Sequence, residues 1–297
     1  MGPVNPYAGQ VEPARLEDIA VTVAREASDR ARLRRAEVFG VGAYTADGSA
    51  AQDPVRAKST PTDPVTVVDT ETEEFVRARL SQLRPGDPVF GEEQGDGGGV
   101  PARGDVRWVV DPIDGTVNFL YGIPAYAVSV AAQIDGVSVA GAVADIAGGT
   151  VYSAHRGGGA RELRPGVEPR TLAANPITDL GLALVATGFG YQAARRRRQA
   201  AVLAQLLPQV RDVRRVGSAA LDLCMVAAGR VDAHYEHGLS PWDWAAGGLI
   251  AAEAGAMVTV PAPDSTSADG FLTFAAAPGV ATALIDALRA AGGLEAL

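Results

Sequence analysis

The apolar positions of the N-terminal region repeat with the period of an α-helix. Between residues 14 and 39, apolar side chains are spaced by three and four residues, which places them on one face of a helix. A second helix is predicted to begin after Thr66 and to run to about Leu83, because residues 84–87 read Arg-Pro-Gly-Asp and end it. Residues 40–64 are rich in Gly, Ala, Ser, Asp and Pro, which is typical of a surface loop.

The pattern then changes to that of β-strands. Residues 88–93 are short and apolar and stop at two acids, and a glycine-rich loop at 95–104 leads to the apolar run 108–110. Three further Val- and Ala-rich segments follow, with the turn signals Asp-Gly and Gly-Gly between them. Together these segments predict an antiparallel meander, with strands at 125–134, 137–146 and 149–155.

Strands and helices alternate in the second half of the chain. The apolar segments predict strands at 180–187, 213–216, 232–236, 256–260 and 271–276, and helices at 192–210, 218–229, 241–254 and 279–291. Early helices, a meander and then alternating β and α segments indicate a layered α/β architecture. We expect one domain spanning residues 1–297, built from two tightly packed halves at about 14–155 and 156–291, because acids from both halves serve one site.

Composition and charge narrow the class of protein. The 297 residues are 47% hydrophobic and 21% charged, as in an ordinary globular protein, and no apolar run approaches the roughly 18 residues that span a bilayer. The net charge of −9 argues against a nucleic-acid partner. Residues 1–6 lack the features of a signal peptide, and the single Cys224 predicts a buried structural thiol, so we expect a cytoplasmic protein. The basic runs 30–35 and 195–198 are interpreted as solvated helix faces.

One nonapeptide carries the strongest chemical signal. Directly after the apolar run 108–110, the sequence reads Asp111-Pro112-Ile113-Asp114-Gly115-Thr116-Val117-Asn118-Phe119. Two carboxylates at the end of a strand suit Mg²⁺, which proteins bind through one or two carboxylates together with the phosphate of a substrate. Ligands of open α/β sheets also bind beyond the carboxyl ends of the strands. Taken alone, however, the motif is equally compatible with a strand and an ordinary Asp-Gly turn.

Three more acids follow similar local patterns. Glu92 ends one apolar strand as Asp111 ends another, so two neighbouring strands would bring their oxygens close together. Asp243 can close a capping box with Ser240, and Asp69 can do the same with Thr66, and each could also offer an oxygen to a site. A loop before Asp69 could bring Lys58 to a phosphate, although a lone lysine in a loop is usually solvated.

These residues, in this order, resemble the inositol monophosphatase family of Mg²⁺-dependent, lithium-sensitive phosphatases. The similarity extends from about residue 14 to 291 and is closest to actinobacterial inositol-1-monophosphatases. It rests on the nonapeptide at 111–119, on the motifs Gly91-Glu92-Glu93, Gly217-Ser218-Ala219-Ala220, Tyr235-Glu236 and Trp242-Asp243, and on segments such as 58–69 and 121–124. The resemblance implies the αβαβα five-layered sandwich shared with fructose-1,6-bisphosphatase, a homodimer, and hydrolysis of inositol monophosphate by metal-activated water.

The resemblance also implies roles for individual residues. Glu92, Asp111 and the Ile113 carbonyl would hold one Mg²⁺, Asp111, Asp114 and Asp243 a second, and Glu92 would help with a weaker third. Thr116, paired with Asp69, would orient the attacking water, so Asp69, Glu92 and Thr116 are the expected catalytic residues. The expected substrate contacts are Glu92, Ile113, Asp114, Gly115, Thr116, Gly217, Ser218, Ala219, Glu236 and Asp243, with backbone amides of Gly115 and Thr116 on the phosphate and Glu236 on hydroxyl groups. Li⁺ is expected to inhibit.

Several alternatives stay open at this level. A fructose bisphosphate, histidinol phosphate or nucleotide 3′-phosphate could replace inositol monophosphate as the substrate. Residues 40–57 look longer than in many relatives, and the pair Ser240-Pro241 and the bulky Trp244 depart from the family at an edge expected to choose the substrate. Phosphatases of the haloacid dehalogenase type carry acids two residues apart, whereas Asp111 and Asp114 are three apart. A non-catalytic regulatory protein on the same scaffold is disfavoured because every expected metal position holds its acid.

Overall fold

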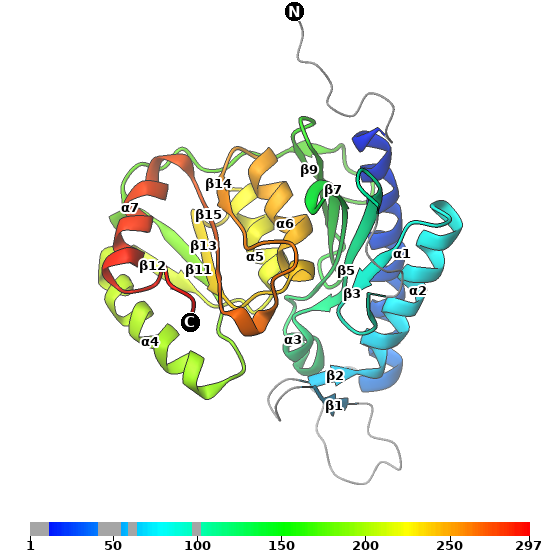
Figure 1. Cartoon of the computed structure of the whole chain (residues 1–297), viewed down its shortest axis with the longest axis horizontal. Coiled ribbons are helices and arrows are strands. Elements are labelled where there is room, and N and C mark those ends of the chain that lie inside the picture. The colour runs from blue at the N-terminus through cyan, green and yellow to red at the C-terminus, as the bar shows by residue number, and fades with distance from the viewer. Residues whose placement is uncertain (1–11, 41–54, 59–63, 97–101) are drawn as a thin grey trace, which may run out of the picture.

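Five layers of alternating helices and sheets make up the computed structural model, which describes residues 12–40, 55–58, 64–96 and 102–297 (Figure 1). In order they are two helices, a large mixed sheet, two helices, a smaller mixed sheet and two further helices. The predicted αβαβα sandwich is therefore confirmed. Most of the long loop predicted at 40–64, and residues 97–101 of the glycine-rich loop, lie outside the described residues.

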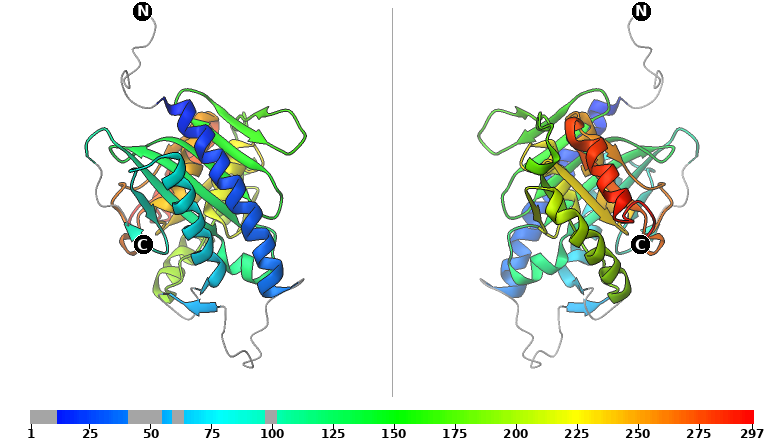
Figure 2. Two further views of the ribbon diagram at one scale, coloured as in Figure 1. Left: turned by 90° about the vertical axis from the view of Figure 1, so that its right-hand side faces the viewer. Right: turned by 90° about the vertical axis from the view of Figure 1, so that its left-hand side faces the viewer.

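Helices α1 (Pro13–Phe39) and α2 (Val67–Leu83) cover the outer face of the larger sheet (Figure 2). The apolar stripe of α1 is buried against this sheet, as its three- and four-residue spacing predicts. The sheet has the strand order β10–β9–β8–β7–β6–β5–β3–β4. Its strands are β3 (Val89–Gly91), β4 (Gly95–Asp96), β5 (Val106–Asp114), β6 (Ala127–Ile134), β7 (Val137–Asp145), β8 (Val151–His155), β9 (Ala160–Leu163) and β10 (Arg170–Thr171).

Helices α5 (Ala219–Ala227) and α6 (Pro241–Glu253) form the middle layer, and most of their residues are buried between the two sheets. The smaller sheet has the order β12–β11–β13–β15–β14. Its strands are β11 (Leu184–Thr187), β12 (Asp212–Arg214), β13 (Ala233–His237), β14 (Met257–Thr259) and β15 (Leu272–Ala276). Helices α4 (Ala193–Leu206) and α7 (Pro278–Ala290) cover its outer face (Figure 2). A separate pair, β1 (Val55–Ala57) and β2 (Pro64–Thr66), precedes α2.

The strand before the nonapeptide is longer than the sequence predicts. Strand β5 includes both Asp111 and Asp114, and its pairing with β6 shifts register between these two residues. Pro112 lies at the shift, and a proline has no backbone N–H to donate to a ladder. The strand thus bends at the point where its acids are presented. Helix α3 (Thr116–Tyr121), which sequence analysis did not predict, begins directly after Gly115.

Other boundaries differ in smaller ways. A 3₁₀ turn at Leu180–Leu182 precedes β11, and another at Leu207–Gln209 replaces the end of the predicted helix 192–210, because Pro208 cannot continue it. Strands β9 and β10 and a 3₁₀ turn at Ser267–Asp269 were not predicted. Each of these elements has five residues or fewer, which is too short for a clear periodic pattern.

The interpretation of the basic run 195–198 is wrong at its first residue. Arg195 is buried, and its guanidinium donates hydrogen bonds to the carbonyl oxygens of Leu297 and Ala268. The remaining arginines of this run are exposed, as predicted. Cys224 is buried in the middle layer and forms no disulfide, also as predicted. No helix in the described part of the chain is long and apolar enough to cross a membrane.

Candidate active site

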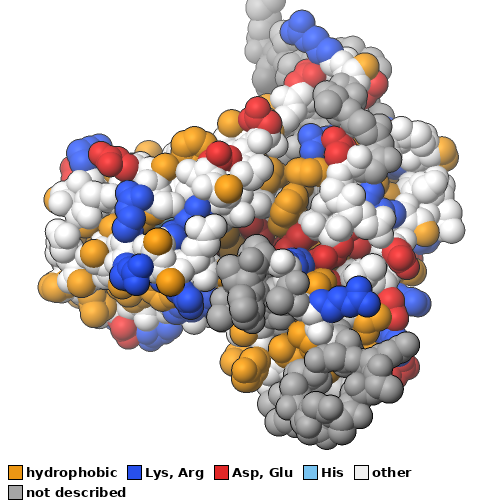
Figure 3. Space-filling model, turned by 60° about the horizontal axis from the view of Figure 1, so that its bottom comes forward, with side chains coloured by type: hydrophobic (Ala, Val, Ile, Leu, Met, Phe, Trp, Pro, Cys, Tyr) orange, Lys and Arg blue, Asp and Glu red, His pale blue; other side chains and the backbone are white. Residues whose placement is uncertain are grey.

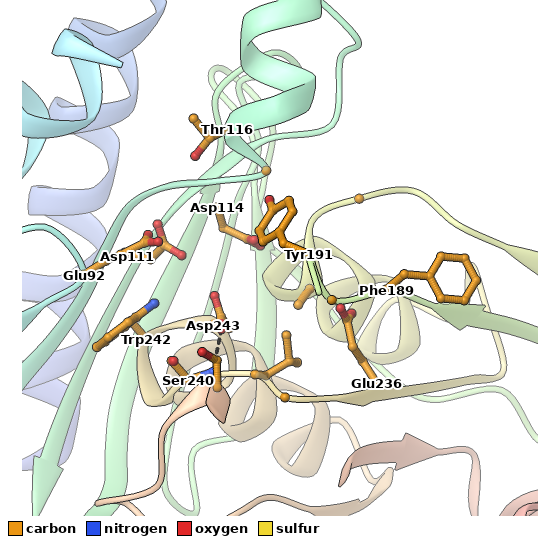
Figure 4. Close-up of a pocket in the computed structure, with 18 of the residues that line it drawn as sticks. Glu92, Asp111, Asp114, Thr116, Phe189, Tyr191, Glu236, Ser240, Trp242 and Asp243 are labelled. Atoms are coloured by element: carbon orange, nitrogen blue, oxygen red, sulfur yellow. Dashed lines mark hydrogen bonds between the residues drawn. The ribbon is translucent and has the colours of Figure 1, made fainter. Parts of the chain in front are cut away.

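Three carboxylates from two different elements converge at one end of the sheets. Asp111 and Asp114 come from β5, and Asp243 comes from the first turn of α6. Each offers an oxygen atom such that all three oxygens lie within 4.8 Å of one another. Figure 4 shows these side chains pointing toward one another, with Glu92 beside Asp111. Figure 3 shows the same region from outside, with acidic side chains gathered in a hollow between the two sheets and their helices.

The fold holds one oxygen of each of these carboxylates. Oδ1 of Asp111 accepts a hydrogen bond from the backbone N–H of Ile113 at 3.0 Å. Oδ2 of Asp114 accepts from the Ser218 hydroxyl at 2.6 Å and from the Ala220 amide at 2.7 Å. Oδ2 of Asp243 accepts from the Ser240 amide at 2.7 Å, closing the predicted capping box of α6. The three side chains are therefore held in place by hydrogen bonds, and each contributes one oxygen to the cluster.

Glu92 reaches the site from a parallel strand, as predicted. Strand β3 runs parallel to β5 with Gly91 opposite Val110, so Glu92 follows β3 close to Asp111. The carboxylate of Glu92 accepts a hydrogen bond from Lys58 Nζ at 2.8 Å, and the same amine also pairs with Glu93. Burial opposes the charge of Lys58, but the carboxylates of Glu92 and Glu93 outweigh it and raise the pKa of the amine. Lys58 is therefore a fixed cation at the site.

Thr116 and Asp69 also meet, as predicted. The Thr116 hydroxyl lies 3.0 Å from Asp69 Oδ1 and 3.1 Å from the Ile113 carbonyl oxygen. Asp69 closes a capping box with Thr66 at the start of α2, so one side chain serves both the helix and the site. Thr116 begins α3 immediately after Gly115, whose φ of +93° is a left-handed conformation that favours glycine.

Burial and mutual repulsion raise the pKa values of the acidic cluster. Burial, followed by the charges of neighbouring acids, raises the pKa of Asp111 and of Asp243 well above the usual range. Burial raises the pKa of Asp114 and of Asp69 to about 6, although hydrogen bonds oppose the shift. Ionising these groups together is costly without a nearby cation. This arrangement therefore favours binding of a cation or a proton.

The predicted substrate residues line the same pocket from the other side. Gly217, Ala219 and Glu236 belong to its wall together with the metal-site residues, and Ser218 lies directly behind Asp114. In Figure 4, Glu236 lies on the far side of the cavity from Glu92, below Tyr191 and Phe189. Trp242 contributes its ring to the wall. Trp244, in contrast, is buried in the core of the middle layer, so the expectation that it lies at the substrate edge is wrong.

Sequence analysis missed several residues that shape this pocket. Arg215 lines the wall and lies against Gly217, where an added Cβ would come within 2.3 Å of its Nη1 atom. The Asn118 amide donates to the Ala125 and Val216 carbonyls at 2.9 and 2.8 Å and so joins α3 to the segment before α5. Glu73 accepts from the amide of Glu93. Asn118 stands inside the nonapeptide and could have been singled out, whereas isolated Arg and Glu residues carry no local signal.

Comparison with known proteins agrees with this geometry. The profile of the inositol monophosphatase family matches residues 13–291. The chain belongs to the inositol monophosphatase family. Membership supports a phosphatase, and the resemblance noted from the motifs is confirmed.

Individual relatives match between two thirds and nearly all of the chain. Inositol-1-monophosphatase of Mycobacterium leprae is 58% identical over 95% of this chain and 96% of its own length. The solved structure of Mycobacterium tuberculosis SuhB superposes with a TM-score of 0.79 at 52% identity, covering 96% of this chain and 99% of that one. The Nus factor SuhB of Vibrio cholerae is 39% identical over 66% of this chain and 72% of its own length.

Proposed function

We propose that the protein is a Mg²⁺-dependent phosphomonoesterase that hydrolyses inositol monophosphate to inositol and phosphate. The observation that carries the proposal is the convergence of Asp111, Asp114 and Asp243 within 4.8 Å of one another. Similarity to inositol-1-monophosphatases over almost the whole chain supports the same substrate class. The predicted homodimer, cytoplasmic location and inhibition by Li⁺ stay predictions.

The residues present fit Mg²⁺. All side-chain donors of the cluster are carboxylate oxygens, which suit a hard cation, and no histidine or cysteine belongs to the cluster among the described residues. The raised pKa values of Asp111 and Asp243 support a cation at the cluster, because positive charge would stabilise their ionised forms. Asp111, Asp114 and Asp243 would hold one ion, and Asp111, Glu92 and the Ile113 carbonyl another, with a third near Glu92. Bound Mg²⁺ would polarise the phosphate and lower the pKa of a water molecule.

The remaining steps fall to Thr116 and Asp69. An ionised Asp69 accepts a hydrogen bond from the Thr116 hydroxyl, as the 3.0 Å contact allows. The lone pairs of the hydroxyl oxygen are then directed to a water molecule, which Thr116 orients toward the phosphorus atom. Asp69 and Thr116, together with Glu92 at the proposed metal site, are the proposed catalytic residues. No nucleophilic side chain is needed, because a water molecule attacks the phosphorus.

The substrate would span the pocket between the acidic cluster and Glu236. Backbone amides of Gly115 and Thr116 would bind phosphate oxygens, because Gly115 lets the main chain approach closely. Gly217, Ser218 and Ala219 would border the alcohol part of the ester, and Glu236 would accept hydrogen bonds from its hydroxyl groups. Asp114 and Asp243 would contact the phosphate end.

Replacement of one carboxylate tests the proposal. Asp111→Asn removes the charge of the acid shared by the two proposed ions while preserving its shape, so we expect Mg²⁺-dependent phosphate release from inositol 1-phosphate to fall by about 1,000-fold or more. Calorimetric titration should show weaker Mg²⁺ binding in the same variant. Asp286→Asn, at an exposed position far from the pocket, is the matched control and should keep full activity.

Retention of most activity by Asp111→Asn would overturn the site assignment. A panel of phosphate esters, compared by kcat/KM at fixed Mg²⁺ with and without Li⁺, separates inositol monophosphate from sugar and nucleotide phosphates. Mg²⁺ binding without turnover of any ester would favour the non-catalytic alternative, in line with the Nus factor name of the Vibrio cholerae relative.

A further inference from the structure

A buried histidine lies behind the substrate side of the pocket. His234 and Glu236 are two residues apart on β13, so their side chains leave the same face of the sheet. The cross-strand neighbours of His234 are Ala186 and Ala275, which face the core of the middle layer, whereas Tyr235 packs into the outer core. His234 therefore points toward α5, and Glu236 follows it on the same face at the pocket.

Asp222 from α5 meets this histidine. Its Oδ2 atom lies 3.5 Å from His234 Nδ1, and the two side chains are 1% and 0% exposed. Neither ring nitrogen of His234 nor Oδ1 of Asp222 has a hydrogen-bond partner among the described residues. The hydroxyl of Thr273 also lacks a hydrogen-bond partner among the described residues. Thr273 lies on β15 directly opposite Glu236 in the strand register. A buried carboxylate is costly unless a cation compensates it, and the imidazole is the group placed to do so.

Glu236 depends on the same compensation. Its carboxylate lies over Gly188, where an added Cβ would come within 2.1 Å of Oε2. Asp222 of α5, Asp114 of β5 and Asp243 of α6 all add negative charge around it. The opposing cations are His234 and the exposed Arg215.

The charges of His234, Asp222 and Glu236 therefore depend on one another. Burial raises the pKa of Glu236 to about 7, and His234 opposes that shift more strongly than Arg215 does. Burial lowers the pKa of His234, but the carboxylates of Asp222, Glu236 and Asp114 outweigh burial and raise it. Loss of the imidazolium charge would raise the pKa of Glu236 further and so reduce its ionised fraction near neutral pH.

We propose that His234 is a positioning residue for substrate binding, whose imidazolium, paired with Asp222, increases the ionised fraction of Glu236, the form that accepts hydrogen bonds from hydroxyl groups of the substrate. The inference rests on the proposed function in one respect, namely that Glu236 contacts the alcohol part of the ester. A role for Glu236 distinguishes two classes of ester. A polyhydroxylated alcohol such as inositol can donate hydrogen bonds to Glu236, whereas a phenyl ester cannot.

Histidine NMR tests the charge of His234 without any substrate. The chain contains three histidines, His155, His234 and His237, so ring signals of the full-length, Mg²⁺-saturated protein can be assigned with a His234→Phe variant. We expect His234 to titrate above pH 6.5, and Glu236→Gln and Asp222→Asn each to lower its midpoint by about one pH unit. The proposal would be overturned if the His234 ring is neutral between pH 6 and 9, or if its titration midpoint does not change in either variant.

Kinetics test the consequence for binding. In His234→Phe we expect the KM for inositol 1-phosphate to rise roughly tenfold at pH 6.5, with kcat little changed, because a charge-assisted hydrogen bond becomes a neutral one. The difference should close toward pH 9, where Glu236 ionises without help. The KM for phenyl phosphate should not change. His237→Phe replaces a buried histidine of the same strand on the opposite face and should leave both pH profiles in place.

The outcomes are distinct. A KM increase of equal size at every pH, or on both esters, would assign His234 a purely structural role. If neither ester is hydrolysed by the wild-type protein, the proposed function fails while the NMR titration still decides the charge of His234. Should His234→Phe not fold, His234→Gln serves in its place, and the titration of the wild-type protein needs no variant at this position.

Discussion

At the scale of single residues, the pocket depends on how closely backbone segments approach. Gly217 combines a φ of +99° with an added Cβ that would come within 2.3 Å of Arg215 Nη1 and 2.8 Å of Asn118 Nδ2. Arg215 is a flexible side chain and can move, but the Asn118 amide is fixed by two hydrogen bonds. A side chain at position 217 therefore strains the main chain and displaces the wall of the pocket.

The substitution Gly217→Ala should accordingly affect both stability and binding. We expect a loss of about 1 kcal/mol in the free energy of unfolding from the left-handed backbone, and a several-fold increase in the KM for inositol 1-phosphate. Gly157→Ala is the matched control, since Gly157 has a φ of +79° and an added Cβ there would meet no described atom within 4 Å. It should lose similar stability in denaturant unfolding but keep its KM. An unchanged KM in Gly217→Ala would show that the wall tolerates the extra atom.

At the scale of elements, the short helix α3 joins the two sheets at the pocket. Its Asn118 donates to carbonyl oxygens of Ala125 and Val216, which lie before β6 and before α5. Helix α3 thus links the nonapeptide to the segment before α5, which borders the substrate side of the pocket. The local sequence explains the helix only after the fact, because six residues are too few for a periodic pattern.

Asn118→Leu should disconnect these segments. Two buried carbonyl groups lose their donor, so we expect a loss of about 1–3 kcal/mol in the free energy of unfolding and a KM that rises at least several-fold. Asn175 offers a matched control, because its amide also donates twice, to Gly229 O at 2.9 Å and Asp232 Oδ1 at 2.8 Å, away from the pocket. Asn175→Leu should lower stability without changing KM. If Asn118→Leu and Asn175→Leu have the same KM, the idea that α3 joins the two segments at the pocket is contradicted.

At the scale of the whole molecule, periodicity predicted the long elements and the layers, and contiguous motifs predicted most of the site. Helix α1 follows its hydrophobic pattern because one face of the helix is buried. The strands of the meander β6–β8 read as Val- and Ala-rich runs because helices cover both faces of the sheet and nearly all of the strand residues are buried. Capping boxes at Asp69 and Asp243 were visible locally and proved to hold site acids as well. Arg215, Glu73 and the pair Asp222–His234 were not predictable, because their roles arise from contacts between segments distant in the sequence.

The buried acids should also make the stability of the Mg²⁺-free protein depend on pH. The pKa values of Asp69 and Asp114 rise to about 6, and those of Glu93 and Glu236 to about 7, mainly through burial. Carboxyl groups of the unfolded chain titrate near 4, so the folded state binds more protons between about pH 4 and 7. Stability must therefore fall as the pH rises through this window.

We expect the EDTA-treated protein to be more stable at pH 5 than at pH 8 by at least about 2 kcal/mol, seen as a Tm higher by roughly 5 °C. The lowered pKa of His237 acts in the opposite direction but involves one group only. Saturating Mg²⁺ competes with these protons and stabilises the ionised cluster, so it should raise the Tm far more at pH 8 than at pH 5. Calorimetric scans at the two pH values, with EDTA and with Mg²⁺, give the four Tm values needed. A Tm of the metal-free protein that rises from pH 5 to pH 8 would mean that the acidic cluster is not desolvated, and it would remove the electrostatic reason for a cation at this site.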